Sequence, residues 1–400
     1  MRRPGGGAGT GVTELGRDLR RDVHRARHEF VSLLRELAEL ESPTDVPAAQ
    51  EPVQERFATV LEELDFSLEL VPGEGRSGGL LVARGPGASH GRPTQLLVGH
   101  TDTVWPVGTL EEMPVTEEDG RLHGPGTLDM KGGLTQMVVA LRALARRGLE
   151  PALPVVVLVN SDEEIGSPES RPLVERLARE ADRAWVLEPA LGASGRIKTA
   201  RKGVGHMTVV VRGRPAHAGL EPEKGASAIQ ELAHVIHALH ALTDLDRGIT
   251  VNVGVVDGGA RPNVVAPEAR ARVDVRVPTV DAGDEVERAI RSLVPRVEGV
   301  RLEVEGGMLI PPMEATPRNQ ALWRAARDAG RELGFDLEEA RVGGASDGNT
   351  TSRHTATLDG LGCVGDGAHA RHEHIVVEPS LDRCALLARL LLLDPEVAKS

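Results

Sequence analysis

Three apolar runs in the first half of the chain each end in side chains that can bind a metal ion. The run Pro154–Asn160 is continuous and β-branched, which is typical of a strand buried on both faces. Sites in open α/β sheets are assembled at the carboxyl ends of strands, so we expect the three ends to lie together. The runs and the residues that follow them are Gln95–Gly99 with His100, Pro154–Asn160 with Asp162, Glu163 and Glu164, and Ala184–Leu187 with Glu188.

Segments with helical spacing of apolar residues separate these runs. The alternation of helix and strand predicts an α/β fold. The predicted helices in this part of the chain are Thr13–Leu40, Val53–Leu64, Leu134–Arg147 and Arg171–Arg179. The alternation resumes after Pro312 with helix Asn319–Leu333, strands Leu337–Val342 and Leu361–Asp366, and a closing helix from Ser380.

Between residues 200 and 308 the pattern changes to β-α-β-β-α-β, the order of a ferredoxin-like split unit. Its elements are Val204–Val211, Gly225–Leu242, Thr250–Val256, Arg270–Val277, Ala282–Val294 and Arg301–Glu305. We therefore predict that an inserted ferredoxin-like domain, residues 200–308, divides a mixed-sheet catalytic domain made of residues 13–199 and 309–400. Residues 1–12 are expected to form a disordered leader.

Composition narrows the classes of function. With 47 basic and 60 acidic residues the net charge is −13, which argues against nucleic acid as a partner. No apolar run approaches the roughly 20 residues that span a bilayer, and the N-terminus lacks the apolar segment of a secretory signal. We therefore expect a cytoplasmic protein with no membrane partner. Two cysteines are too few for a Cys-based zinc site, and the chain has no Tyr to act as an acid.

The candidate metal ligands each have an ordinary interpretation when taken alone. His100 and Asp102 are compatible with a loop histidine and a turn aspartate. Asp129 fits a helix cap, and Glu163 with Glu164 fits a solvated acidic turn. However, adjacent carboxylates directly after a buried strand repel each other and raise one pKa. A bound cation is the simplest way to neutralise them.

Three histidines near the C-terminus, His369, His372 and His374, are compatible with a surface cluster that has no role. His369 lies at the predicted loop tip and is the favoured ligand. With it the chain offers five nitrogen and oxygen ligands of the kind that zinc takes, namely His100, Asp129, Glu164, Glu188 and His369. Such a set suits two ions about 3.5–4 Å apart that share one carboxylate. Glu163 is then left to take a proton from water.

Five motifs follow one another along the chain: His100-Thr-Asp102, Gly124-Pro-Gly126 with Asp129-Met-Lys-Gly-Gly133, Asp162-Glu163-Glu164-Ile-Gly166, Glu188-Pro189 and Gly367-Ala-His369. They resemble the motifs of the co-catalytic zinc family that includes aminoacylase, acetylornithine deacetylase, succinyl-diaminopimelate desuccinylase and the glutamate carboxypeptidases. The resemblance extends from about residue 25 to residue 395, includes the inserted domain, and is greatest to glutamate carboxypeptidases of the carboxypeptidase G type.

The resemblance implies roles for these residues. Asp129 would bridge two zinc ions per subunit, and the peptide bond after it would be cis. The other ligands would divide into His100 and Glu188 on one ion, and Glu164 and His369 on the other. Asp102 would fix the tautomer of His100, and Glu163 would be the general base that later carries the proton to the leaving amine. Cobalt or manganese would also suit this site, because such ligands select weakly by affinity alone.

The inserted domain carries a further signature, Gly213-Arg-Pro-Ala-His217-Ala-Gly219. A histidine in a loop is usually inert. In this family the matching histidine reaches across a dimer interface and stabilises the developing oxyanion, and a chain without Tyr has few other candidates for that role. The resemblance therefore implies a homodimer formed through the lid, with His217 acting on the partner's site.

The same resemblance implies residues that bind the carboxylate end of the substrate. Asn263 and Arg276 match such lid residues, and a guanidinium forms bidentate pairs with a carboxylate. Arg276 is also compatible with an exposed strand residue that pairs with a nearby acid. The glycine-rich loop at 343–348, which includes Gly344 and Ser346, resembles a substrate loop whose backbone N–H groups hold the same carboxylate.

That loop also fits G-x-S-x-G, the nucleophile elbow of serine hydrolases, with Asp359 and His369 following in the appropriate order. This makes a serine hydrolase that uses Ser346 a remote alternative. An elbow leads into a helix, and residues 349–355 are poor helix formers. The elbow also leaves Glu163 and Glu164 without a role.

The candidate ligands and the resemblance together thus imply a dimeric di-zinc enzyme that cleaves an amide or peptide bond and releases a C-terminal amino acid. Its substrate would be a small peptide or an N-acyl amino acid. The alternative is a deacylase of the acetylornithine deacetylase or succinyl-diaminopimelate desuccinylase type. Glutamate-releasing members of the family place a basic residue near the end of the lid. Residues 305–310 contain none, so an amino acid with a neutral side chain fits equally well.

Overall fold

The computed structural model describes residues 12–89 and 91–399. The expected leader, residues 1–12, lies outside these ranges except for Val12. The described residues form two compact units. The first comprises the chain up to Thr199, Ala315–Arg341 and the chain from Ser346, and the second comprises Ala200–Glu314 and Val342–Ala345.

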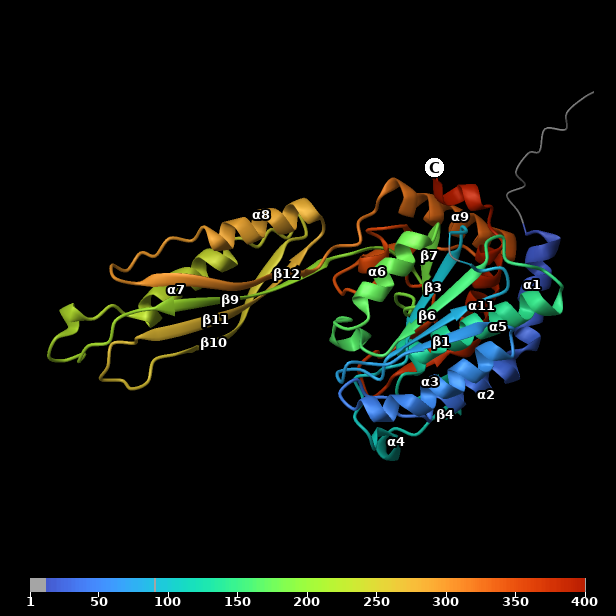
Figure 1. Cartoon of the computed structure of the whole chain (residues 1–400), viewed down its shortest axis with the longest axis horizontal. Helices are drawn as coiled ribbons and strands as arrows, with labels where there is room; N and C mark the ends of the chain where they lie inside the picture. The colour runs from blue at the N-terminus through green and yellow to red at the C-terminus, as the bar shows by residue number, and fades with distance from the viewer. Residues whose placement is uncertain (1–11, 90, 400) are drawn as a thin grey trace, which may run out of the picture. The chain divides into compact units, whose positions relative to one another are not determined.

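The first unit is built on a six-stranded mixed sheet (Figure 1). Its central strands are parallel, and only the two strands at one edge run antiparallel to their neighbours. Every residue of β3, β6 and β7 is buried, which confirms the two-sided burial predicted for β6. The strands in spatial order are β1 (Ser67–Val71), β2 (Leu80–Arg84), β6 (Val155–Asn160), β3 (Gln95–His100), β7 (Arg183–Val186) and β14 (Ala356–Leu358).

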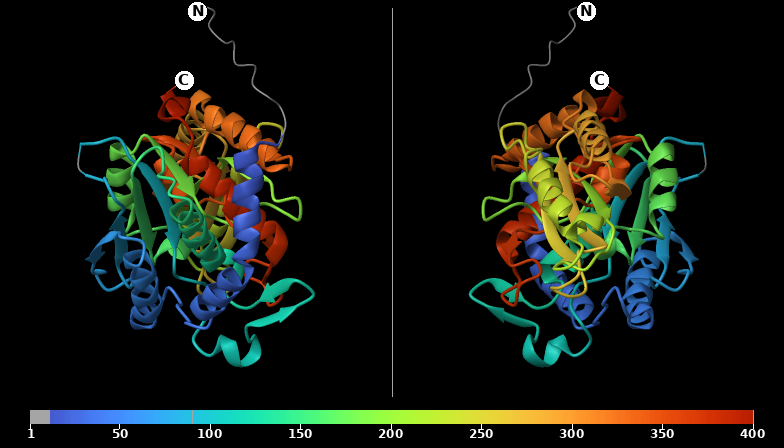
Figure 2. Two further views of the ribbon diagram at one scale, coloured as in Figure 1. Left: turned by 90° about the vertical axis from the view of Figure 1, so that its right-hand side faces the viewer. Right: turned by 90° about the vertical axis from the view of Figure 1, so that its left-hand side faces the viewer.

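Helices cover both faces of this sheet. Alternate residues of β3 point to opposite faces, with Leu97 in the larger core and Leu96 and Val98 in the smaller core. The smaller core is closed by α6 (Arg171–Glu180), and the larger core by a set of longer helices (Figures 1 and 2). These are α1 (Glu14–Arg25), α2 (Arg27–Ala38), α3 (Pro47–Glu62), α5 (Gly132–Arg146), α9 (Pro317–Leu333) and α11 (Val377–Leu391).

Shorter elements complete the first unit. A small antiparallel sheet contains, in spatial order, β15 (Gly365–Asp366), β16 (His374–Val376), β5 (Arg121–His123) and β4 (Thr116–Glu118). Strand β16 contacts the irregular turn Thr127–Lys131, so this small sheet brings the C-terminal histidine segment to the turn that carries Asp129. Further short elements are α4 (Thr109–Glu112), α10 (Asp347–Thr351) and the 3-10 turns Glu163–Ile165 and Pro395–Lys399. The strand pair β8 (Ile197–Arg201) and β13 (Glu339–Val342) begins in the first unit, and its last residues belong to the second.

The second unit has a four-stranded antiparallel sheet with two helices on one face. Alternating apolar residues, such as Val273 and Val275 of β11, form its core beneath the helices. The elements follow one another as β9 (Gly203–Arg212), α7 (Ala228–His240), β10 (Thr250–Gly258), β11 (Glu268–Val277), α8 (Val280–Arg291) and β12 (Arg301–Ile310). The spatial order of the strands is β10-β11-β9-β12.

Two helix predictions were wrong. The predicted helix Thr13–Leu40 is divided into α1 and α2, because Ala26 adopts a ψ of 13° and leaves helical geometry. The segment after Ser346 was judged a poor helix former but forms α10. Ser346 accepts a hydrogen bond from the N–H of Gly348, and the side chain of Asn349 accepts one from the N–H of Ser346. This capping box overrides weak propensity over one short turn.

No helix between residues 12 and 89 or between 91 and 399 has both the length and the apolar character that crossing a membrane requires.

A substitution at Gly133 tests how closely α5 packs against the end of β7. A Cβ atom at Gly133 would lie 2.1 Å from the carbonyl oxygen of Leu187, the residue before Glu188. We expect Gly133→Ala to lower the free energy of unfolding by about 1–3 kcal/mol or more through overpacking. The measurement is the midpoint of thermal unfolding, which should fall. Gly343→Ala is the matched control, because a Cβ atom there meets nothing within 4 Å. Equal midpoints for the two variants would contradict this packing.

Candidate metal centre

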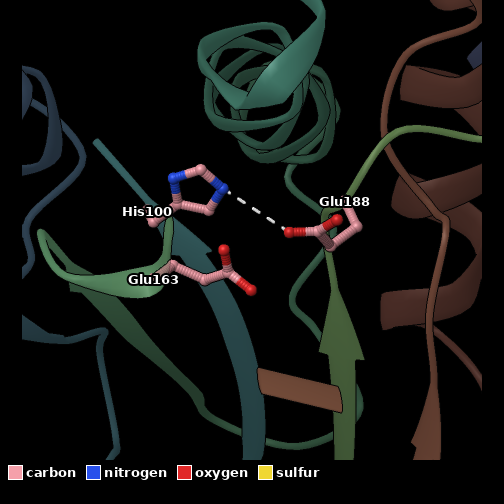
Figure 3. Close-up of side chains that lie close together, drawn as sticks. All are labelled: His100, Glu163 and Glu188. Carbon is pink, nitrogen blue, oxygen red and sulfur yellow. Dashed lines mark ion pairs between the residues drawn. The ribbon is translucent and has the colours of Figure 1, made fainter. Parts of the chain in front are cut away.

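Three candidate residues converge where the parallel strands β3, β6 and β7 end. His100 is the last residue of β3, Glu163 lies in the turn after β6, and Glu188 follows β7. Figure 3 shows the three side chains pointing toward one another. His100 Nε2 lies 3.5 Å from a carboxylate oxygen of Glu188, and one ligand atom from each residue falls within 4.8 Å of the others. The expected convergence of strand ends is confirmed for these residues.

A second group of ligand atoms shares His100 and adds Asp129 and Glu164, again within 4.8 Å of one another. The two oxygens of Asp129 face different imidazoles, with Oδ1 3.3 Å from His100 Nε2 and Oδ2 3.4 Å from His369 Nε2. His369 Nε2 also lies 3.1 Å from Glu164. Asp129 therefore contacts both histidines, one through each carboxylate oxygen. The peptide bond between Asp129 and Met130 is cis.

Two buried polar atoms in this cluster support its fit to a divalent cation. His100 Nε2 and Glu164 Oε1 are buried and lack a hydrogen-bond partner in the described part of the chain. Buried polar atoms are nearly always satisfied, so two such atoms in one cluster require explanation. Imidazole nitrogens and carboxylate oxygens are the ligands that zinc and similar ions take. The donor set therefore fits a metal ion.

Charge in the cluster is unbalanced. Burial raises the pKa of Glu163 well above its usual value, and the negative charge of Glu188 adds to the shift. Burial also raises the pKa of Glu164, although its hydrogen bond with His369 opposes the shift. Hydrogen bonds with Asp129 and Glu164 raise the pKa of His369 to about 10. These pKa shifts arise because several buried carboxylates lie close together, so that each disfavours the charged form of the others and favours the charged form of a nearby histidine.

Asp102 is fully buried and organises the ligands. Its carboxylate accepts hydrogen bonds from the backbone N–H groups of Glu163 and Glu164, at 3.3 and 3.1 Å. His100 Nδ1 lies 3.0 Å from the Asp102 carbonyl oxygen and 3.3 Å from its carboxylate. Both are acceptors, so Nδ1 carries a proton, and Nε2 is the nitrogen that faces Asp129 and Glu188 in the cluster. The hydroxyl of Thr44 donates to Asp102 at 2.8 Å, a contact that no sequence pattern indicated.

Glu373 is another buried carboxylate beside the cluster, and sequence reasoning missed it. It is 1% exposed, and its partners include the Trp105 indole and the backbone N–H of Asp129. Burial raises its pKa to about 7, against hydrogen bonds that favour the charged form.

Its neighbours His372 and His374 drew attention as candidate ligands. In the structure His372 lies 3.9 Å from Asp366, and the His374 ring stacks on His123.

Two candidates of the second unit, His217 and Asn263, lie in loops that hydrogen-bond to each other. The N–H of Ala218 donates to the carbonyl oxygen of Asn263 at 3.0 Å. His217 is exposed, and its Nδ1 accepts from the N–H groups of Gly219 and Leu220, both at 3.1 Å. An accepting Nδ1 places the proton of the neutral ring on Nε2. His217 is therefore held as an Nε2–H donor.

The other two candidates of the second unit have local partners. Arg276 donates hydrogen bonds from Nε and from Nη2 to the carboxylate of Asp274, and both shortest distances are 3.0 Å. This contact matches the interpretation of Arg276 as a strand residue that pairs with a nearby acid. The carbonyl oxygen of Gly344 accepts from Arg201 at 3.2 Å, so this loop is anchored through a carbonyl group.

Ser346 is buried, and its hydroxyl donates to Asp359 at 2.6 Å while accepting from Gly348 N–H at the start of α10. A serine nucleophile needs a histidine that takes its proton. Here a carboxylate occupies that position directly, and the hydroxyl is used in helix capping. The local geometry thus does not favour the serine hydrolase alternative.

Comparison with known proteins gives a family for the chain. Residues 96–393 match the model of peptidase family M20/M25/M40. The chain is similar to carboxypeptidase G2 of Pseudomonas sp. (strain RS-16), with 27% identity over 80% of this chain and 79% of that one. It is also similar to succinyl-diaminopimelate desuccinylase of Rhodospirillum centenum, with 28% identity over 90% of this chain and 96% of that one.

Among solved structures, the fold is similar to that of aminopeptidase PepT from Bacillus cereus ATCC 10987, with a TM-score of 0.76 and 23% identity over 93% of this chain and 99% of that one. The mixed α/β fold and the hydrolase class expected from the motifs are confirmed. Because the family model covers most of the sequence, the chain belongs to peptidase family M20/M25/M40.

Proposed function

We propose that this protein is a di-zinc hydrolase that cleaves an amide or peptide bond and releases a C-terminal amino acid, as the similarity to carboxypeptidase G2 suggests. The observation that carries the proposal is Asp129, whose two oxygens face His100 and His369 within a cluster of buried acidic ligands. His100 and Glu188 would hold one ion, and Glu164 and His369 the other. Bound ions would polarise the scissile carbonyl and acidify a water molecule.

Glu163 is proposed as the general base. Its carboxylate lies within 4.8 Å of the ligand atoms of His100 and Glu188, close enough to serve a water molecule at the centre. Burial raises its pKa, which suits a group that must take a proton and then give it to the leaving amine. Asp102 holds the backbone of Glu163 and thereby aims this carboxylate.

The second unit is proposed as a ferredoxin-like lid and dimerisation domain. The Nε2–H of His217 is suited to stabilise an oxyanion of the partner's substrate, because the backbone groups on Nδ1 fix the tautomer. Asn263, Arg276 and the loop with Gly344 and Ser346 are proposed to bind the carboxylate end of the substrate.

A deacylase is the second candidate. The similarity to succinyl-diaminopimelate desuccinylase spans more of the chain than that to carboxypeptidase G2, and it favours hydrolysis of an N-acyl amino acid. Both candidates break an amide whose amine side is an amino acid with a free carboxylate. The proposed centre serves either reaction without change, so the distinction depends on the groups that bind the rest of the substrate.

A substrate panel with selective inhibitors tests the proposed reaction. We expect hydrolysis of at least one compound among benzoyl-glutamate, benzoyl-leucine, dipeptides, N-acetylornithine and N-succinyl-diaminopimelate. EDTA or phenanthroline should abolish it, zinc, cobalt or manganese should restore it, and a fluorophosphonate should leave it unchanged. Activity that survives chelation but is lost to the fluorophosphonate would refute the metal mechanism and favour Ser346.

Two histidines on one loop provide a matched test of the ligand set. His369→Ala should lower the zinc content of the purified protein, because His369 contacts both Asp129 and Glu164. His372→Ala should retain the wild-type content, because His372 lies on the same loop with its side chain 66% exposed, near Asp366. Metal analysis by mass spectrometry measures both. Equal zinc loss in the two variants would show that loop integrity, and not a ligand, was removed.

Variants of the neighbouring residues Glu163 and Glu164 distinguish the proposed general base from a proposed metal ligand. Glu163→Ala should keep the wild-type metal content and lower kcat by about 10²–10⁴-fold, the usual contribution of general base catalysis. Glu164→Ala should instead lose metal. Turnover and metal content are measured on the same samples. Normal hydrolysis by Glu163→Ala would show that another group takes the proton.

A further inference from the structure

The buried carboxylate of Glu373 is surrounded by four N–H donors. Its Oε1 accepts from the backbone of Leu128 at 2.9 Å and of Asp129 at 3.1 Å. Its Oε2 accepts from Trp105 Nε1 at 2.8 Å and from the backbone of Gly126 at 3.1 Å. We call these five groups the Glu373 clamp. Two of the four donors, Leu128 and Asp129, belong to the turn Thr127–Lys131, and Gly126 directly precedes that turn.

The main chain of Glu373 joins the same two segments. Its carbonyl oxygen accepts a hydrogen bond from the N–H of Gly124 at 3.2 Å, and its own N–H donates to the carbonyl oxygen of Ala370 at 2.9 Å. The loop between Gly367 and Glu373 turns sharply, with left-handed backbone at Gly367 (φ 84°) and at His369 (φ 61°). The clamp thus ties the loop that carries His369 to the turn that carries Asp129.

These two segments supply two neighbouring candidate ligands, since His369 Nε2 lies 3.4 Å from Asp129 Oδ2. We propose that Glu373 is a positioning residue that sets the separation of Asp129 and His369, and thereby the affinity of the centre for its metal ion. The inference rests on the proposed metal site. Glu373 itself does not belong to the ligand set.

The chemistry of the clamp requires a carboxylate. Four N–H groups converge on it, and an ionised carboxylate is the side chain that offers two oxygens and only acceptor sites. An amide in its place would turn an NH₂ group toward two of the donors and leave them unsatisfied in a buried environment. The turn at Asp129 would then shift to regain partners, and the ligand oxygens would move with it.

The experiment compares Glu373→Gln with Arg371→Gln at pH 8 in full-length protein. Arg371 lies on the same loop, its side chain is 78% exposed, and its partner is Glu112. Zinc affinity is measured by competition with a chromogenic chelator, and the unfolding midpoint of the metal-free protein is measured in parallel. We expect Glu373→Gln to raise the zinc Kd by about 10–100-fold, as loss of a supporting group around metal ligands does. Arg371→Gln should keep the wild-type Kd.

A lower unfolding midpoint with unchanged zinc affinity in Glu373→Gln would overturn the inference, because it would mark a purely structural role. Should Glu373→Gln fail to fold, Glu373→Asp and Trp105→Phe replace it. The former keeps an acceptor-only group on a shorter stem, and the latter removes one donor. Each should bind zinc more weakly than wild type, and wild-type affinity in both would overturn the inference. A wild-type protein that binds no zinc would instead refute the proposed function.

Discussion

Parallel pairing of β6, β3 and β7 is the constraint on which the candidate site depends. In this register Gln95 lies opposite both Val155 and Arg183, and His100 lies opposite Asn160. The three strands therefore end at the same edge of the sheet. Apolar side chains are buried on both faces of these strands, and a slip of one residue would exchange the two faces. The register that packs the cores is therefore the register that turns His100, Glu163 and Glu188 toward one another.

Gathering acids at one buried edge has an electrostatic cost, and the protein offsets part of it without a metal. Asp129, Glu163, Glu164 and Glu188 lie together, and burying unpaired charge is strongly unfavourable. The imidazoles of His100 and His369 face these acids and offset part of their charge. Two further acids at this edge, Asp102 and Glu373, are stabilised by backbone N–H groups of the ligand-bearing turns. Under the proposed function, bound cations balance the remaining charge.

The apolar pattern predicted β3, β6 and β7 to within a residue or two, and the five candidate ligands do converge. The pattern did not predict groups defined by tertiary contact. Thr44 reaches Asp102 from a loop 58 residues earlier, and Glu373 is one acid in a polar loop with no periodic neighbours. Their roles depend on which backbone donors the fold brings to them. The catalytic roles of individual residues stay predictions.

The second unit raises a question of selectivity that the metal centre does not answer. The two proposed reactions break the same type of bond, so under the proposed function the choice between them depends on groups that bind the ends of the substrate. Arg276 is one proposed group, yet its Nε and Nη2 already bond Asp274. A substrate carboxylate must either approach Nη1 or displace Asp274, which also lies 3.3 Å from His206. Under the proposed function, Asp274 would therefore orient the guanidinium, oppose weakly bound anions and contribute to selectivity from the same strand.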